Sequence, residues 1–326
     1  MEMIMQVTRA EHYFDFSKSY LPKKERIGLS QKIKRIQTLK REKNAVILAH
    51  NYQTPKIFHT VSDIVGDSLA LAREAEKVQA DIIVLAGVHF MAETAKLLNP
   101  EKTVFIPDLQ AGCSLAESIT ASDVESLRIL YPGIPIITYV NTSASVKAAS
   151  DICCTSGNAK KIVESLGVPK VIMIPDEYLA RNVAKATDVT IIPWKGHCQV
   201  HERITCEDIH RMRADHPEAK ILAHPECPPE VTQLADFSGS TAEMAEFMDQ
   251  KRANDVILLT ECSMSDNLAI SYPHINFIRL CNLCPHMQRI TLDNILDTLE
   301  YDQYEVHIDP IIADKARLSI KRMLNA

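Results

Sequence analysis

The sequence repeats one pattern three times along its 326 residues, and this repeat constrains the fold more than any other feature. In TVFIPDLQAGC, VTIIPWKGHC and NFIRLCNLC, a strand-like run leads through a short loop to a cysteine and then to a helical pattern. The cysteines that end these strings are Cys113, Cys198 and Cys284, which lie 85 and 86 residues apart. Self-similarity at a fixed period indicates that one ancestral unit is used three times.

Short runs rich in β-branched residues alternate with helical patterns throughout, so the sequence predicts an α/β fold with parallel sheets covered on both faces. The predicted strands are Ala45–His50, Asp81–Ala86, Thr103–Ile106, Pro135–Val140, Lys170–Ile174, Val189–Ile192, Lys220–Ala223, Asp255–Leu259 and Asn276–Ile278. The helices after three of these strands are predicted at Val88–Leu98, Glu177–Ala186 and Met264–Ile270. We expect three modules at residues 1–115, 116–200 and 201–308, with a C-terminal helix at 309–326 packed against the first.

Charge and composition exclude several classes of protein. The net charge is −6, and no long basic run supplies the surface that nucleic acid requires. The N-terminal stretch lacks the apolar core of a secretory signal, and no run approaches the roughly 20 apolar residues that span a bilayer. We therefore expect a cytosolic enzyme, in which nine cysteines indicate metal binding or reactivity before disulfides.

The three repeated cysteines are candidate metal ligands. Each follows a strand, where ligands of parallel α/β sheets bind, and each opens a helical pattern that favours a thiolate. If the modules surround a pseudo-threefold axis, the three sulfurs meet at one centre, where they suit a cubane cluster with one iron left open. Three buried cysteines in the core, or an incomplete zinc site, are the alternatives.

The remaining cysteines carry weaker expectations. Cys281 and Cys284 form a Cys-x-x-Cys pair, which indicates either redox control of the site or only a cysteine beside a ligand. Cys206 and Cys262 are expected to be packing residues. Cys227 is expected to lie near a site.

A second set of repeated loops carries hydroxyl groups next to glycines that allow close approach to a ligand. Their spacing is 88 and 85 residues, close to that of the cysteines. These loops are expected to bind anions, or to act as ordinary helix caps, which serine and threonine also favour. The hydroxyl residues are Ser68, Ser156, Ser240 and Thr241.

A third set of side chains lies at the predicted strand ends and can carry protons or hydrogen bonds to a substrate. These residues are His50 and Tyr52 in LAHNY, Tyr139 and Asn141 in ITYVN, and His224 and Glu226 in LAHPE. Two histidines at matched positions, each followed two residues later by another proton carrier, favour a functional role. His201 and the other histidines lack this symmetry.

These loops belong to eight strings that run in the order AHNYQ, VGDSLALA, TYVNTSA, CTSGNA, GHCQVHER, AHPEC, SGST and CPHM. Together the strings resemble those of the quinolinate synthase family of NAD biosynthesis, and the resemblance runs from about Ile27 to the C-terminus. It implies three pseudo-symmetric α/β/α sandwich modules around a central cavity with a [4Fe-4S] cluster. Some members have a longer cysteine string near the last ligand than this chain has.

The resemblance implies a transferase that condenses iminoaspartate with dihydroxyacetone phosphate, releases phosphate and water, and closes the ring of quinolinate. Cys113, Cys198 and Cys284 would hold the cluster, whose free iron acts as a Lewis acid. The implied proton carriers are His50, Tyr52, His224 and Glu226. The implied carboxylate and phosphate ligands are Ser68, Tyr139, Asn141, Ser156 and Thr241, with Ser240 beside them.

Other activities remain compatible with the same residues. A different iron–sulfur dehydratase or lyase would keep the cluster and change the small acid, whereas a non-catalytic iron–sulfur sensor would need an output surface that the sequence does not show. An L-aspartate oxidase that supplies the unstable iminoaspartate is an expected transient partner, although the sequence contains no docking motif for it.

Overall fold

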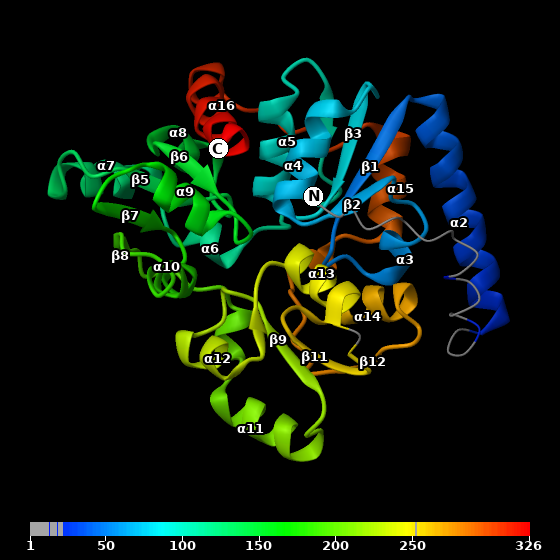
Figure 1. Ribbon diagram of the computed structural model, residues 1–326. Helices are drawn as coiled ribbons and strands as arrows, with labels where there is room; N and C mark the ends of the chain where they lie inside the picture. Colours follow the sequence, from blue (N-terminus) through cyan, green and yellow to red (C-terminus); the bar gives the residue numbers. More distant parts are fainter. Residues whose placement is uncertain (1–12, 14–17, 19–21, 252) are drawn as a thin grey trace. The chain divides into compact units, whose positions relative to one another are not determined.

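The computed structural model describes Tyr13, Lys18 and residues 22–326 except residue 252 (Figure 1). Its first module contains a parallel sheet with the strand order β2-β1-β3-β4. The strands are β1 (Ala45–His50), β2 (Ile64–Gly66), β3 (Ile82–Ala86) and β4 (Thr103–Phe105). The helices are α2 (Lys23–Glu42), α3 (Pro55–Phe58), α4 (Ser68–Lys77) and α5 (His89–Leu98).

The second module repeats this plan with the strand order β6-β5-β7-β8, again parallel. Its strands are β5 (Ile136–Tyr139), β6 (Ile152–Cys154), β7 (Lys170–Ile174) and β8 (Thr190–Pro193). Its helices are α6 (Ser114–Glu117), α7 (Ala121–Leu130), α8 (Ala144–Ala149), α9 (Ala159–Ser165) and α10 (Glu177–Ala184).

The third sheet has the equivalent order β10-β9-β11-β12. Its strands are β9 (Lys220–Ala223), β10 (Phe237–Ser238), β11 (Asp255–Leu259) and β12 (Asn276–Ile278). The remaining helical segments are η1 (His201–Arg203), α11 (Cys206–Asp215), α12 (Pro229–Leu234), α13 (Thr241–Lys251), α14 (Cys262–Ser271), η2 (Met287–Arg289), α15 (Leu292–Tyr301) and α16 (Pro310–Asn325). The predicted α/β class with three repeated parallel sheets is confirmed.

The central strands are apolar on both faces because helices cover both sides of a parallel sheet. Ile47 and Leu48 are neighbours in β1, point to opposite faces, and are both fully buried. Ile136 and Ile137 in β5 follow the same pattern, as do Ile257 and Leu258 in β11. This burial on two faces explains the continuous apolar runs in the sequence.

An aspartate anchors the first strand of each module in the same way. Its carboxylate accepts the N–H of Ile47, Ile136 or Ile221 at 2.8, 2.7 and 2.9 Å. It also pairs with a basic residue on the preceding helix, at 2.7, 3.1 and 3.3 Å. The pairs are Lys40 with Asp63, Arg128 with Asp151 and Arg213 with Asp236.

The structure also contains three equivalent capping boxes, in which a threonine and the residue three positions later satisfy each other's backbone N–H groups. They begin helices α7, α11 and α15. The threonines are Thr120, Thr205 and Thr291.

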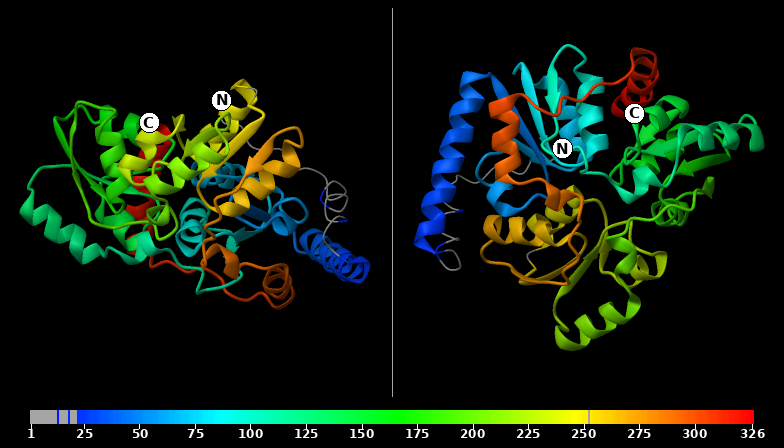
Figure 2. Two further views of the ribbon diagram at one scale, coloured as in Figure 1. Left: turned by 90° about the horizontal axis from the view of Figure 1, so that it is seen from below. Right: turned by 180° about the vertical axis from the view of Figure 1, so that it is seen from behind.

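Contacts group the chain into two compact units. One comprises the described residues up to Ala111 together with Glu261–His307, and the other comprises Gly112–Thr260 with Ile308–Ala326. Within the first unit, α2 lies along α15 (Figures 1 and 2), where Arg35 Nε contacts Glu300 Oε1 at 2.9 Å. The module boundaries at residues 115 and 200 stay a prediction. None of the helices in the described ranges is both long and apolar enough to cross a membrane.

The C-terminal helix corrects one expectation. We expected it to pack against the first module, but α16 packs against α8 and β6 of the second (Figures 1 and 2). Its buried face presents Ala316, Ser319 and Ile320, and the Ser319 hydroxyl lies 3.3 Å from the Cys153 thiol. Because the apolar stripe of a helix shows only that it is buried, the sequence could not identify the surface that receives it.

Candidate active site

The three cysteine loops have the same backbone structure. In each, the N–H four residues later donates to the cysteine carbonyl at 3.0 Å, from Glu117 to Cys113, from Glu202 to Cys198 and from Gln288 to Cys284. Two residues before each cysteine, a carbonyl accepts the N–H of the first residue of α5, α10 or α14, at 2.7, 2.9 and 3.1 Å. The loops are therefore equivalent, as their spacing predicts.

All three cysteines are half-buried, and none of them is in a disulfide. Cys113 and Cys198 belong to the same compact unit, where the charge of Cys113 contributes to a raised pKa of Cys198. Burial, followed by the charge of Glu226, raises the pKa of Cys198 well above its usual value, despite hydrogen bonds from the amides of His201 and Val200. The amides at the helix start do favour the Cys198 thiolate, as expected, but burial and the charge of Glu226 outweigh them. Binding of a metal there would release a proton.

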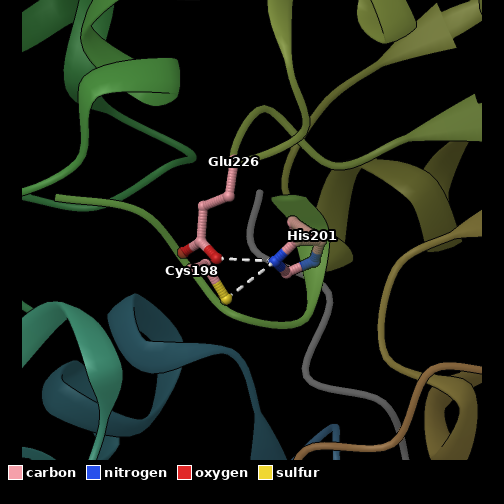
Figure 3. A group of neighbouring side chains, drawn as sticks. All are labelled: Cys198, His201 and Glu226. Atoms are coloured by element: carbon pink, nitrogen blue, oxygen red, sulfur yellow. Dashed lines mark hydrogen bonds and ion pairs between the residues drawn. The ribbon is translucent and has the colours of Figure 1, made fainter. Parts of the chain in front are cut away.

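Glu226 is the centre of a polar cluster in the second unit (Figure 3). Its carboxylate lies 2.8 Å from His201 Nδ1 and accepts the Tyr139 hydroxyl at 2.5 Å. Asn141 Nδ2 donates to it at 3.4 Å, and His224 Nδ1 lies 4.0 Å away. Glu226 has only about 4% of its surface exposed, so these contacts replace water as partners of its carboxylate.

The strand ends explain why these residues meet. Tyr139 ends β5, while His224 and Glu226 follow directly after β9. The carboxyl ends of parallel strands are where α/β proteins place their ligands. The structure thus brings together four residues that the sequence predicted as site residues, namely Tyr139, Asn141, His224 and Glu226.

The pKa values of two buried carboxyl groups in this cluster are shifted in opposite directions. Burial alone would raise the pKa of Glu226, but the charges of His201 and His224 and the Tyr139 hydroxyl outweigh it and hold that pKa well below the usual range. Burial and the negative charge of Glu226 raise the pKa of Asp176 well above the usual range. The surroundings therefore favour the ionised form of Glu226 and the protonated form of Asp176.

His201 is the residue that sequence reasoning missed. It is almost fully buried, and its Nδ1 lies 3.1 Å from Cys198 Sγ while its Nε2 lies 2.9 Å from Thr260 Oγ1. Its ring stacks on His224 with the ring centroids 4.7 Å apart. Cys198, His201 and Glu226 present sulfur, nitrogen and oxygen ligand atoms within 4.8 Å of one another, so they could hold a metal ion.

One of the predicted hydroxyl residues caps a helix, whereas two others do not. Ser240 Oγ accepts the N–H of Glu243 at 3.3 Å and thus caps α13. The cap of α4 is Asp67 and not Ser68, and Ser156 lies in the loop before α9 without serving as its cap. A Cβ atom on Gly157 would lie 3.1 Å from Ser240 Oγ, so the second and third hydroxyl loops meet in the second unit. Thr241 is buried beside Ser240.

His50 and Tyr52 lie in the first unit and form a local turn. The N–H of Tyr52 donates to His50 Nδ1 at 3.2 Å, and their rings pack edge to face with centroids 4.6 Å apart. The N–H of Glu226 donates to His224 Nδ1 in the same way at 3.3 Å. The matched spacing of the two histidines thus corresponds to one repeated turn.

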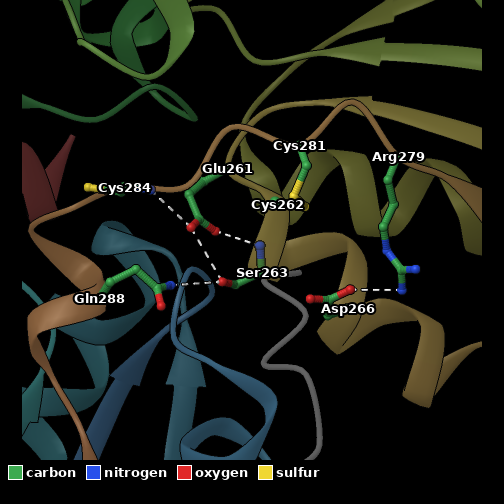
Figure 4. Close-up of a disulfide and its surroundings, with 8 residues drawn as sticks. All are labelled: Glu261, Cys262, Ser263, Asp266, Arg279, Cys281, Cys284 and Gln288. Atoms are coloured by element: carbon green, nitrogen blue, oxygen red, sulfur yellow. Dashed lines mark hydrogen bonds and ion pairs between the residues drawn. A yellow bond between two sulfur atoms is a disulfide. The ribbon is translucent and has the colours of Figure 1, made fainter. Parts of the chain in front are cut away.

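A disulfide joins Cys262 to Cys281 in the first unit (Figure 4). Cys262 is buried, as expected of a packing residue, but it is also bonded. Cys281 bonds to Cys262, so of the two alternatives for Cys281 and Cys284 the redox pair is wrong. Cys262 and Cys281 meet because the N–H of Cys262 donates to the carbonyl of Asn282 at 3.1 Å, which places these two segments of the backbone side by side. Glu261 accepts the N–H of Cys284 at 3.2 Å, and burial raises the pKa of Glu261 to about 7.

Comparison with known proteins identifies the family. The family model described as quinolinate synthetase A protein matches residues 34–325. The chain belongs to the quinolinate synthetase A family.

The relatives within this family match over nearly their whole length. The quinolinate synthase of Agrobacterium fabrum is 63% identical over 319 residues, which cover 98% of this chain and 92% of that protein. Quinolinate synthase 2 of Mesorhizobium japonicum is 64% identical over 97% of both chains. The quinolinate synthase of Xylella fastidiosa is 67% identical over 92% of this chain and 88% of its own. The resemblance inferred from the eight sequence strings is confirmed.

Proposed function

We propose that the protein is a quinolinate synthase that condenses iminoaspartate with dihydroxyacetone phosphate and releases phosphate and water. The observation that carries this proposal is the sequence identity of 63% over 98% of the chain with a protein named quinolinate synthase, together with the polar cluster around Glu226. The product would enter NAD biosynthesis.

The proposal includes a [4Fe-4S] cluster held by Cys113, Cys198 and Cys284. The donor set fits such a group: the three cysteines are outside disulfides, half-buried and carried by loops of equal backbone structure, and the charge of Cys113 contributes to a raised pKa of Cys198. Three thiolates leave one iron of a cubane without a protein ligand. When bound, the cluster would supply a Lewis acid that polarises a hydroxyl or carboxylate of the substrate.

Proton transfer is assigned first to Glu226, because its carboxylate is ionised and buried. A proton taken from a substrate carbon or nitrogen would be held between Glu226 and the Tyr139 hydroxyl, which already donates to that carboxylate. His224, at 4.0 Å, would exchange protons with the same group. His50 and Tyr52, which lie in the first unit, are proposed as further proton carriers.

Substrate binding is assigned to neutral donors, because both substrates are anions and the chain as a whole is negative. Helix starts and hydroxyls supply partial positive charge without a formal cation. Asn141 extends an amide toward the Glu226 cluster, and the Ser156 and Ser240 loops meet in the second unit. The proposed ligands of carboxylate and phosphate groups are Ser68, Tyr139, Asn141, Ser156, Ser240 and Thr241.

The test is a product assay under strictly anaerobic conditions, with iminoaspartate generated in the cuvette and dihydroxyacetone phosphate added. Quinolinate and phosphate should appear in a one-to-one ratio, and Ser156→Ala should raise KM for the phosphate substrate more than it lowers kcat. Failure to form quinolinate by protein with a full complement of iron would contradict the proposed activity.

A supplier of iminoaspartate is part of this proposal. An imine of this kind hydrolyses in water, so an amino-acid oxidase that makes it must act nearby. L-aspartate oxidase is the proposed transient partner, and adding it should raise quinolinate yield above that obtained from chemically generated iminoaspartate at the same rate of supply.

A further inference from the structure

We infer that Asn182 is a positioning residue that fixes the backbone on both sides of Glu226, an inference that rests on the proposed role of Glu226. Asn182 lies on α10 and is separated from Glu226 by more than 40 residues of sequence. The same arrangement recurs in the first unit, where Asn267 Nδ2 donates to the carbonyls of Asn51 and Gln53 on both sides of Tyr52, at 3.0 and 2.8 Å. The link between Asn182 and Glu226 is visible only in the folded chain.

The Asn182 amide holds the loop at its two flanking carbonyls. Its Nδ2 donates to the carbonyl of Pro225 at 2.9 Å and to the carbonyl of Cys227 at 3.0 Å. Its Oδ1 accepts the hydroxyl of Thr232 at 2.9 Å. These partners fix the orientation of the amide, because only the NH₂ group can face two carbonyls. Glu226 therefore lies between two anchored peptide groups.

The loop itself supplies few donors, since Pro225, Pro228 and Pro229 have no N–H. Its own turn uses the N–H of Cys227, which donates to the carbonyl of His224 at 2.9 Å. Residues 224–228 are buried, so their carbonyls lack free access to water and need protein donors. The side-chain amide of Asn182 donates to two of these carbonyls, those of Pro225 and Cys227.

The helix that carries Asn182 is itself well anchored. Asp176 caps α10 by accepting the N–H of Leu179 at 2.9 Å. Leu179, Ala180 and Val183 are buried on its inner face. An anchored helix transmits its position to the loop, whereas a flexible one would not. The carboxylate of Glu226 can then meet His201 and Tyr139 at fixed distances.

The decisive variant is Asn182→Asp, which keeps the size of the side chain but replaces both donors by an acceptor. Two carbonyl oxygens would then face a carboxylate and repel it. We expect kcat to fall roughly 10- to 100-fold, the effect of a displacement of about 1 Å at a reacting group, with KM changed less than threefold. Iron content should stay at the wild-type value, because no cluster ligand is touched.

Asn99→Asp is the matched control. The Asn99 amide donates in the same way to two backbone carbonyls, those of Ala75 at 3.0 Å and Ala95 at 3.1 Å, but it lies in the first module outside the proposed site. It should lower stability and leave kcat unchanged. If both variants lower kcat equally, the effect is structural and the inference is wrong.

A double-mutant cycle with Glu226→Gln separates positioning from general damage. If Asn182 acts through Glu226, Asn182→Asp should have little further effect on the residual rate of Glu226→Gln, measured as quinolinate accumulated over hours. Full additivity would overturn the inference. Where the residual rate of Glu226→Gln is below detection, Glu226→Asp replaces it in the cycle.

The two proposals fail in different ways. If Glu226→Gln keeps wild-type kcat, the proposed role of Glu226 is wrong whatever Asn182 does. If Glu226→Gln is impaired but Asn182→Asp has wild-type kcat, only the positioning role is wrong. Should Asn182→Asp fail to fold, Asn182→Ala removes the same two donors without adding charge, and the same kcat loss is expected.

Discussion

Replacing Glu226 by glutamine removes one negative charge from a buried cluster while keeping its shape. The carboxylate lies 2.8 Å from His201 Nδ1 and accepts the Tyr139 hydroxyl at 2.5 Å. Glutamine can still accept the tyrosine hydroxyl, but it loses the charge opposite His201. Breaking a buried pair on one side costs about 3–5 kcal/mol, so stability should fall by roughly 3 kcal/mol.

The effect of Glu226→Gln on turnover should be separate from this loss. Removal of a general base lowers a rate by about 10²–10⁴, equivalent to roughly 3–5 kcal/mol of activation free energy. The assay is anaerobic quinolinate formation with iron content measured on the same sample. Iron should be retained, because Glu226 is not among the proposed cluster ligands.

Asp236→Asn is the control for Glu226→Gln. It breaks an ion pair in the same module, since Asp236 pairs with Arg213 at 3.3 Å and accepts the N–H of Ile221 at 2.9 Å. It should cost stability without lowering kcat. Wild-type kcat in Glu226→Gln, or an equal loss in both variants, would refute the assignment of Glu226 as the proton carrier.

Three further predictions concern stability and linkage. Because burial raises the pKa of Asp176, the unfolded chain releases this proton at a lower pH than the folded chain, and the free energy of unfolding should fall as pH rises above about 4. Asp176→Asn should flatten this fall in urea titrations from pH 4 to 8, and an unchanged slope would contradict the prediction. Thr205→Ala removes the cap of α11 and should lower the free energy of unfolding by about 1 kcal/mol in the same titration. An unchanged free energy of unfolding would show that water replaces the cap. Peptide mapping of alkylated, non-reduced protein should recover Cys262 joined to Cys281, whereas a crosslink from Cys281 to Cys284 would contradict the structure.

The sequence predicts the central strands well, because apolar runs that are buried on both faces are distinctive. All nine predicted strands are present. The three that it missed are β2, β6 and β10, which occupy equivalent edge positions in the three sheets. They contain only two or three residues, too few for a periodic pattern, and unlike the equally short β4 and β12 they do not lead into a repeated cysteine string.

The repeat identifies residues that recur and overlooks residues that occur once. Cys113, Cys198 and Cys284 recur and were found, but the position three residues after each cysteine holds Ala116, His201 and Met287. His201 is therefore invisible to an argument from symmetry. Its importance comes from long-range contacts with Glu226 and Thr260, which only the fold creates.

Asp176 shows the same limit in another form. It precedes α10 in the position that Glu261 occupies before α14, and both carboxyl groups are buried. In the sequence each reads as an ordinary helix cap. Burial turns both into carboxyl groups with raised pKa values, and burial depends on the packing of distant segments.

The most direct test of the account is the iron and acid-labile sulfide content of protein purified without oxygen, measured for the wild type and for Cys113→Ser, Cys198→Ser and Cys284→Ser. The account predicts about four irons and four sulfides per wild-type chain, as a [4Fe-4S] cluster requires, and loss of both in each serine variant. Iron-free wild-type protein that still forms quinolinate, or one tightly bound metal ion that depends on Cys198 but not on Cys113 or Cys284, would contradict it.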